Sequence, residues 1–208
     1  MVGGGRAHSE RVDFLEGEPR RNLYSFFNPY YAKVTLMDVL EVIKNRRSVR
    51  KYRPDPIPEE ILKEVLSAAR MAPSANNAQP WKFVIVRDEE LKRRLVQACA
   101  GQKFIAEAPI VIVGCGLPDD AYATAGGYMS SFVMDVTIAM DHLILAATSL
   151  GLGTCWIAAF KEEKVKDILG IPMDVRVVAL TPLGYPDETP ARTSRKDLAE
   201  LVSYDKFD

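Results

Sequence analysis

Residues 46–54 read Arg-Arg-Ser-Val-Arg-Lys-Tyr-Arg-Pro and place five cations and one serine hydroxyl within eight positions. In an extended chain, side chains alternate between two faces, so Arg46, Ser48 and Arg50 would point the same way. A planar guanidinium binds phosphate oxygens in a bidentate manner, and a serine hydroxyl can donate to a further oxygen. The stretch therefore predicts a phosphate site, although a solvated basic loop would have the same composition.

A second stretch, residues 72–81, is rich in small residues and amides and ends in Pro-Trp. Its Asn77 and Gln79 side chains each carry donors and acceptors, which suits the edge of a heterocycle with alternating carbonyl and N–H groups. Asn and Ser side chains also stabilise turns by bonding to nearby backbone. The residues alone leave both roles open.

Two further features lie toward the C-terminus. Residues 151–157 read Gly-Leu-Gly-Thr-Cys-Trp-Ile after a long apolar segment, and Arg192, Arg195 and Lys196 form a second cationic cluster. We find no Ser-His-Asp or Cys-His arrangement, and the chain has only 2 histidines. His142 falls within the apolar segment, where we expect a packed or interface residue. No side chain is therefore assigned as a catalytic acid, base or nucleophile.

Composition narrows the class of protein. The chain of 208 residues carries Lys+Arg 27 against Asp+Glu 28, a net charge of −1 that argues against nucleic acid as the main partner. Its 3 cysteines are far apart and form no CxxC pair, which indicates free, mostly buried thiols in a reducing cytoplasm and no metal site. The N-terminus lacks the apolar core of a signal peptide. Charged residues interrupt the apolar segment 129–152, which favours a core helix over a membrane span.

Hydrophobic periodicity predicts a mixture of helices and about four strands around a hydrophobic central helix, and hence the α+β class. We expect an N-terminal extension over 1–34, partly mobile, with an aromatic cluster at 23–31, and one domain over 35–208. Helices are expected at 35–45, 58–72, 89–100, 129–150 and 161–169, with a last helical turn at 197–202. Strands are expected at 82–86, 110–113, 154–157 and 175–180.

Taken in order, the motifs resemble those of the nitroreductase family of FMN-dependent oxidoreductases. They are Arg-Arg-Ser-x-Arg after the first helix, Pro-Ser-x-x-Asn-x-Gln-Pro-Trp before a strand, Gly-Leu-Gly-Thr-Cys-Trp-Ile after the apolar helix, and the C-terminal cations. Each motif alone is weak, whereas the ordered set is specific. The resemblance runs from about Thr35 to Asp208. It implies an α+β fold with a central mixed or antiparallel sheet flanked by helices, and an intertwined homodimer with FMN sites at its interface.

The resemblance also implies roles for individual residues. The FMN phosphate and ribityl chain would be held by the first arginine stretch and again by the C-terminal cluster. The amide loop of the other protomer would reach the flavin, and backbone after the Gly-Leu-Gly segment would line its ring. The residues of the first arginine stretch are Arg46, Arg47, Ser48 and Arg50, and those of the C-terminal cluster are Arg192 and Arg195. The amide-loop residues are Pro73, Ser74 and Asn77, with Gln79 as a further candidate. The backbone that would line the ring is that of Trp156, Ile157, Ala158 and Ala159. Relatives often carry glycine where Ala158 or Ala159 stands, so the backbone approach to the ring is expected to differ here.

The implied activity is a ping-pong oxidoreductase reaction. NADH or NADPH would reduce the bound FMN and leave, and a small nitroaromatic, quinone or flavin-type acceptor would then take two electrons. Flavin carries this chemistry, so neither a metal nor a protein acid or base is required. Specialised members of the same fold, which fragment flavin or remove halogen reductively, are one alternative. A module that binds flavin without turnover is the other.

Overall fold

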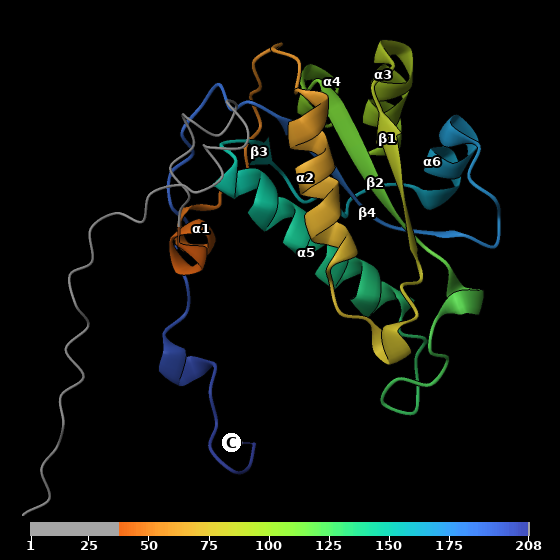
Figure 1. Ribbon diagram of the computed structural model, residues 1–208, viewed down its shortest axis with the longest axis vertical. Coiled ribbons are helices and arrows are strands. Elements are labelled where there is room, and N and C mark those ends of the chain that lie inside the picture. The colour runs from red at the N-terminus through yellow and green to blue at the C-terminus, as the bar shows by residue number, and fades with distance from the viewer. Residues whose placement is uncertain (1–37, 208) are drawn as a thin grey trace, which may run out of the picture. The chain divides into compact units, whose positions relative to one another are not determined.

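The computed structural model describes residues 38–207. In this part of the chain four strands form an antiparallel sheet in the order β1-β2-β4-β3 (Figure 1). The strands are β1 (Trp81–Val86), β2 (Ile110–Gly116), β3 (Gly153–Thr154) and β4 (Arg176–Gly184). The helices are α1 (Val39–Asn45), α2 (Glu59–Arg70), α3 (Glu89–Ala98), α4 (Phe104–Glu107), α5 (Phe132–Ser149) and α6 (Glu162–Leu169). The α+β class is confirmed, with a wholly antiparallel sheet. The predicted extension over 1–34 lies outside the described residues.

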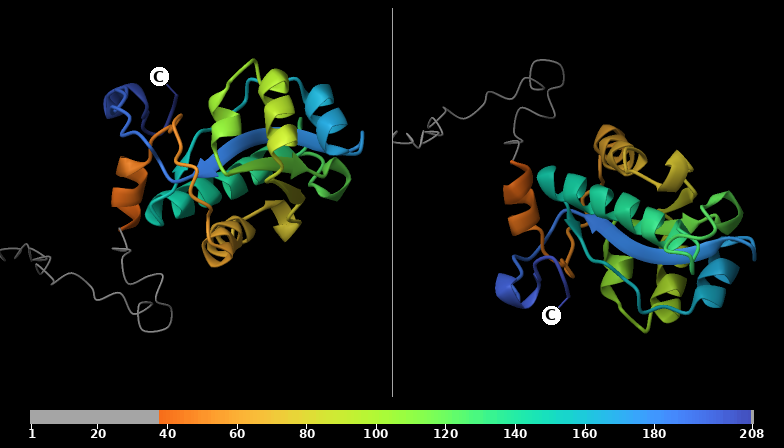
Figure 2. Two further views of the ribbon diagram at one scale, coloured as in Figure 1. Left: turned by 90° about the horizontal axis from the view of Figure 1, so that it is seen from above. Right: turned by 90° about the horizontal axis from the view of Figure 1, so that it is seen from below.

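Strand β2 lies at the middle of the sheet and is buried along its whole length. Its side chains alternate, so Ile110 and Ile112 join the core under α2 and α5, while Val111 and Val113 join the core under α3, α4 and α6. Figure 2 shows these two groups of helices on opposite faces of the sheet. A continuous apolar strand is therefore sandwiched between two helical layers.

Helix α5 runs along one face of the sheet and packs against α2 and the strands. Val136, Met140 and Leu143 are fully buried on its inner side. Its length and composition would also suit a membrane span, but the core helix of a globular domain passes the same test. Its first turn moreover contains the buried carboxylate of Asp135. The position and packing of α5 agree with the predicted core helix.

Most apolar side chains of helix α1 are exposed. The helix is capped by Asp38, whose carboxylate accepts the N–H of Leu40 (2.8 Å), whereas the expected start at Thr35 lies outside the described residues. Val42 is buried, but Val39, Leu40 and Ile43 are 63%, 61% and 52% exposed. The apolar side of this helix is therefore only partly covered within residues 38–207.

The strand predicted over 154–157 is wrong in extent. Only Gly153 and Thr154 belong to β3, and Ile157 returns to the sheet as an isolated bridge to Leu180. Strand β4 in turn continues past its predicted end at Leu180 to Gly184, because its last residues pair with β3. The outer edge of β3 then pairs with the arginine stretch, since Ser48 forms a parallel bridge to Thr154.

Gly153 is required at this edge because the arginine stretch passes directly over it. A Cβ atom on residue 153 would lie 2.9 Å from Cβ and Cγ2 of Val49 and 3.0 Å from its Cγ1. Val49 is β-branched and buried, so it has little freedom to turn away.

We therefore expect Gly153→Ala to lower the free energy of unfolding by about 1–3 kcal/mol, the usual cost of overpacking. Urea unfolding measures this. Val49→Ala removes two of the three close contacts. It should therefore lower the free energy of unfolding less in the Gly153→Ala background than in the wild type. Equal unfolding midpoints for Gly153→Ala and the wild type would contradict the close approach.

Candidate functional site

The chain after α1 is held extended by backbone pairing with two distant segments. The Val49 N–H donates to the Thr154 carbonyl (2.9 Å), and the Arg53 N–H donates to the Tyr185 carbonyl (2.9 Å). Between them, the Tyr52 hydroxyl donates to the Val49 carbonyl (2.6 Å), and burial raises the pKa of this phenol. With Val49 and Tyr52 buried, neighbouring residues turn outward. The arginine stretch is thus fixed by the sheet edge.

A cavity of about 590 Å³ lies where this stretch meets the C-terminal segment. Such a volume is typical of sites for cofactors and other small molecules. The first wall comes from the end of α1 and the extended stretch, and the second from residues 190–195. Its lining residues are Ile43, Lys44, Arg46, Arg47, Ser48, Arg50, Pro190, Ala191, Arg192, Thr193, Ser194 and Arg195. Arg46, Ser48 and Arg50 share this cavity as predicted, but Arg47 lines it too, so strict alternation of faces does not hold here.

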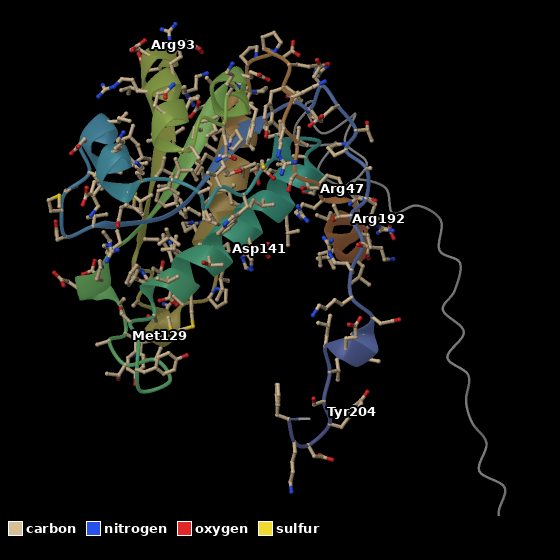
Figure 3. All side chains as sticks on the ribbon, turned by 180° about the vertical axis from the view of Figure 1, so that it is seen from behind. Arg47, Arg93, Met129, Asp141, Arg192 and Tyr204 are labelled. Carbon is tan, nitrogen blue, oxygen red and sulfur yellow. The ribbon has the colours of Figure 1, made fainter. Side chains whose placement is uncertain are left out.

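Two of the guanidinium groups also hold the end of α1. Arg47 Nη1 donates to the carbonyls of Lys44 (2.6 Å) and Arg46 (2.7 Å), and Arg192 Nη2 donates to the Lys44 carbonyl (3.2 Å). The last carbonyls of a helix lack intrahelical donors, so these bonds satisfy them. Figure 3 shows Arg47 and Arg192 side by side at α1. The helix end thereby brings together two cations that are far apart in the sequence.

The guanidinium groups of this cavity have no carboxylate partners in the described chain. Within residues 38–207, none of the five arginines that line it forms an ion pair. Glu188 accepts the backbone N–H of Arg50 (2.6 Å) instead. Arg50 lies 5.9 Å above the Phe104 ring, and Arg195 donates to the Thr193 hydroxyl (2.7 Å). The cavity is therefore a strongly positive site suited to a multiply charged anion.

The three cysteines are free and buried, as predicted. Cys155 lies next to the cavity, where burial raises the pKa of its thiol, although Arg50, a hydrogen bond with Ser48, and Arg46 act in the opposite direction. Burial raises the pKa of both Cys99 and Cys115 to about 11. Neutral thiols are poor nucleophiles and poor metal ligands. No cluster of three or more potential metal ligands occurs in the described part of the chain.

The amide loop is held in an unusual backbone conformation. Asn76, Asn77 and Gln79 have φ values of 53°, 55° and 52°, which non-glycine residues seldom adopt. The Gln79 N–H donates to the Ser74 hydroxyl (2.9 Å), and Gln79 Nε2 donates to the Asn77 carbonyl (3.1 Å). Ser74 and Gln79 therefore make the local turn contacts that the sequence left open. These contacts fix the shape of the loop without excluding a ligand.

This loop does not reach the cationic cavity of its own chain. The Ala75 N–H donates to Asp135 in the first turn of α5, whereas the chain after the last turn of α5 leads to Thr154 beside Ser48. At about 1.5 Å per residue, α5 separates the two places by roughly 20 Å. Figure 3 likewise shows Met129 near one end of this helix and Arg47 and Arg192 near the other.

The sequence-predicted residues thus fall into three groups. Arg46, Arg47, Ser48, Arg50, Arg192 and Arg195 line one cavity; Pro73, Ser74, Asn77 and Gln79 belong to the amide loop; and Trp156, Ile157, Ala158 and Ala159 form the segment after β3. Trp156 is 39% exposed and Ile157 is buried. Sequence reasoning missed six lining residues, whose only signal is their position beside the arginines: Ile43, Lys44, Pro190, Ala191, Thr193 and Ser194.

Comparison with known proteins places this fold in a family. The nitroreductase family model matches residues 43–116 and 100–185. A curated NADH dehydrogenase of Thermus thermophilus is 34% identical over 200 residues, covering 82% of this chain and 98% of the relative. The chain belongs to the nitroreductase family, as its motifs predicted.

Two further matches agree with this membership. A crystal structure of a nitroreductase family protein from Clostridium novyi is 38% identical with a TM-score of 0.70, over 76% of this chain and 89% of that protein. The FMN reductase [NAD(P)H] of Bacillus subtilis is 28% identical over 76% of this chain and 70% of its own length. Sequence and fold therefore lead to the same family.

Proposed function

We propose that this protein is an FMN-dependent NAD(P)H oxidoreductase that passes two electrons to a small organic acceptor of the nitroaromatic, quinone or flavin class. The observation that carries the proposal is the convergence of five arginines without ion pairs on one cavity. Family membership supports it, as do relatives named for NADH dehydrogenase and for NAD(P)H-dependent FMN reductase activity. We expect the protein to act in the reducing cytoplasm.

The residues of the cavity suit the phosphate of FMN. Arg46 and Arg50 face the cavity without a carboxylate partner, so a phosphate dianion would satisfy guanidiniums that the described chain leaves uncompensated. Ser48 lies between them and can bond to the phosphate or to a ribityl hydroxyl. Bound FMN supplies the hydride-accepting and electron-donating chemistry, and the protein binds and orients it. The buried, neutral Cys155 thiol beside the site takes no covalent part.

We propose further that the amide loop serves the flavin of a second copy of the chain. Within one chain, roughly 20 Å of α5 lies between that loop and the cavity. Apolar side chains also remain uncovered on α1, α5 and the C-terminal segment, which supports a homodimer. They include Val39, Leu40, Ile43, Val133, Met134, Ile138, Leu198, Leu201, Val202, Tyr204 and Phe207. In this arrangement two different segments complete each site.

The first experiment tests turnover. Purified protein is loaded with FMN and mixed with NADH, and separately with NADPH, in the absence of oxygen. We expect the flavin absorbance to be lost within seconds in a stopped-flow trace. It should return when a quinone or nitroaromatic is added. A module that binds flavin without turnover would not bleach with either donor. Absence of bound flavin after incubation with FMN would reject the proposal altogether.

The second prediction concerns affinity for FMN. Arg46→Ala and Arg50→Ala each remove a charge-assisted bond worth about 1.5–3 kcal/mol, so each should raise the Kd of FMN by about 10- to 100-fold. Fluorescence quenching of FMN measures the Kd. The matched control is Arg93→Ala, because Arg93 is an exposed arginine on α3 that pairs with Glu90 (2.9 Å) (Figure 3). An unchanged Kd in both variants would remove the phosphate assignment.

The third prediction separates sites shared by two copies from sites within one chain. One parent carries Arg46→Ala and Arg50→Ala, and the other carries Ser74→Ala and Asn77→Ala. If each site takes its arginines from one copy and its amide loop from the other, a mixed dimer regains one intact site. We expect tight FMN binding to return when the two parents are co-expressed and purified through different tags. No recovery in mixed dimers would show that the loop does not act across the interface.

A further inference from the structure

A buried carboxylate outside the cationic cavity joins the amide loop to a second loop. Asp135 is 3% exposed and lies in the first turn of α5. Its Oδ1 accepts the N–H of Ala75 (3.0 Å), and its Oδ2 accepts the hydroxyl of Ser131 (2.6 Å). Both carboxylate oxygens are thus engaged, one by the amide loop and one by the residue that precedes the helix.

Ser131 carries this connection onward. It is fully buried, and its Oγ accepts the N–H of Tyr122 (3.1 Å) while its own N–H donates to the Tyr122 carbonyl (2.8 Å). These two bonds close the base of the loop 122–131. Within that loop Ala125 bridges Met129 across two glycines of positive φ, Gly126 and Gly127. The loop 122–131 is therefore connected to Asp135 through a single side chain, that of Ser131.

We propose that Asp135 and Ser131 are positioning residues that make the amide loop and the loop 122–131 one mechanical unit. The chain of bonds runs from the Ala75 N–H through the Asp135 carboxylate and the Ser131 hydroxyl to the Tyr122 N–H. Three non-glycine residues of the amide loop hold positive φ values, a conformation that persists only where surrounding contacts enforce it. The Asp135 bond to Ala75 is one such contact from outside the loop.

The functional consequence rests on the proposed function. If Ser74 and Asn77 contact the flavin of a second copy, their placement depends on a carboxylate that never touches the flavin. A change at Ser131 would then alter flavin binding, although Ser131 donates its hydroxyl to Asp135 and not to the amide loop. An effect of Ser131 on the amide loop is what distinguishes two coupled loops from two loops with separate local contacts.

Hydrogen–deuterium exchange tests the coupling without requiring flavin. Asp135→Ala removes both bonds, whereas Ser131→Ala leaves the bond to Ala75 formally in place. We expect both variants to accelerate exchange in 74–79 and 121–131 by about fivefold or more, because each protecting bond is worth about a factor of five to ten. Exchange in β2 and α3 should stay at the wild-type rate. The matched control is Asp174→Asn, since Asp174 is an exposed carboxylate in the turn before β4.

Two outcomes overturn the proposal. One is wild-type exchange in 74–79 for Ser131→Ala. The other is a uniform acceleration that includes β2, because it would mean that the pair only supports global stability. If Asp135→Ala does not fold, Asp135→Leu replaces it, because a Leu side chain has the same branched shape as that of Asp and can neither accept from Ala75 nor bond to Ser131. We expect the same acceleration in both loops for this variant, and wild-type exchange in both loops would equally overturn the proposal.

FMN titration of the same variants links the coupling to function. Asp135→Ala, or Asp135→Leu in its place, and Ser131→Ala should each raise the Kd of FMN severalfold, and Asp174→Asn should not. A wild-type chain that binds no FMN would reject the proposed function while leaving the exchange result valid. Selective loosening of both loops with an unchanged Kd of FMN would keep the mechanical unit but overturn its role in flavin binding.

Discussion

The cationic cavity depends on one backbone pairing, that of the arginine stretch with the edge of β3. The Val49 N–H bond to Thr154 fixes the direction in which Arg46, Ser48 and Arg50 point. Gly153 permits this pairing because no side chain stands between the strand and Val49. Guanidinium groups repel one another, so they converge only where a rigid scaffold holds their backbone. Here the scaffold is the central sheet itself, reached through β4 and β3.

Helix α5 imposes the second constraint. Its buried side packs along the sheet, its first turn holds the amide loop through Asp135, and the chain after its last turn forms β3. One rigid element thus determines where both candidate halves of the site lie, and it keeps them apart by its own length. The rise of about 1.5 Å per residue along the helix sets their separation. This geometry, together with the exposed apolar side chains, supports the proposal that a second copy completes each site.

The presence of helices and strands could be predicted from the sequence better than the residues at which they begin and end, and the reasons are local. Long periodic segments such as α2 and α5 carry enough apolar positions to identify a helix and its buried face. The segment 154–157 is apolar as well, but its pairing is decided by partners distant in sequence, so β3 ends after Thr154. In α1 the periodicity was real, yet Val39, Leu40 and Ile43 remain exposed in the described chain. Periodicity indicates that a face is apolar and does not indicate what covers it.

The candidate site was likewise predictable where the signal is local and not where it depends on distant residues. The alternation of Arg46, Ser48 and Arg50 could be inferred from an extended chain, and the family resemblance joined them to Arg192 and Arg195. The bond from Ala75 to Asp135 could not be inferred, because it joins residues 60 positions apart and the carboxylate lies in an apolar helix. An acidic residue in such a helix carries no signal for its partner, and α5 has two of them, Asp135 and Asp141.

The absence of ion pairs around the cavity is what sets its arginines apart from arginines with a structural role. Arg176, for example, is paired with Glu162 (2.9 Å). Five guanidinium groups line one cavity without an ion pair in the described chain. Under the proposed function, the phosphate of FMN would supply the charge-assisted bonds that no carboxylate supplies to them. A preference for FMN over a flavin without a phosphate would then come from these bonds.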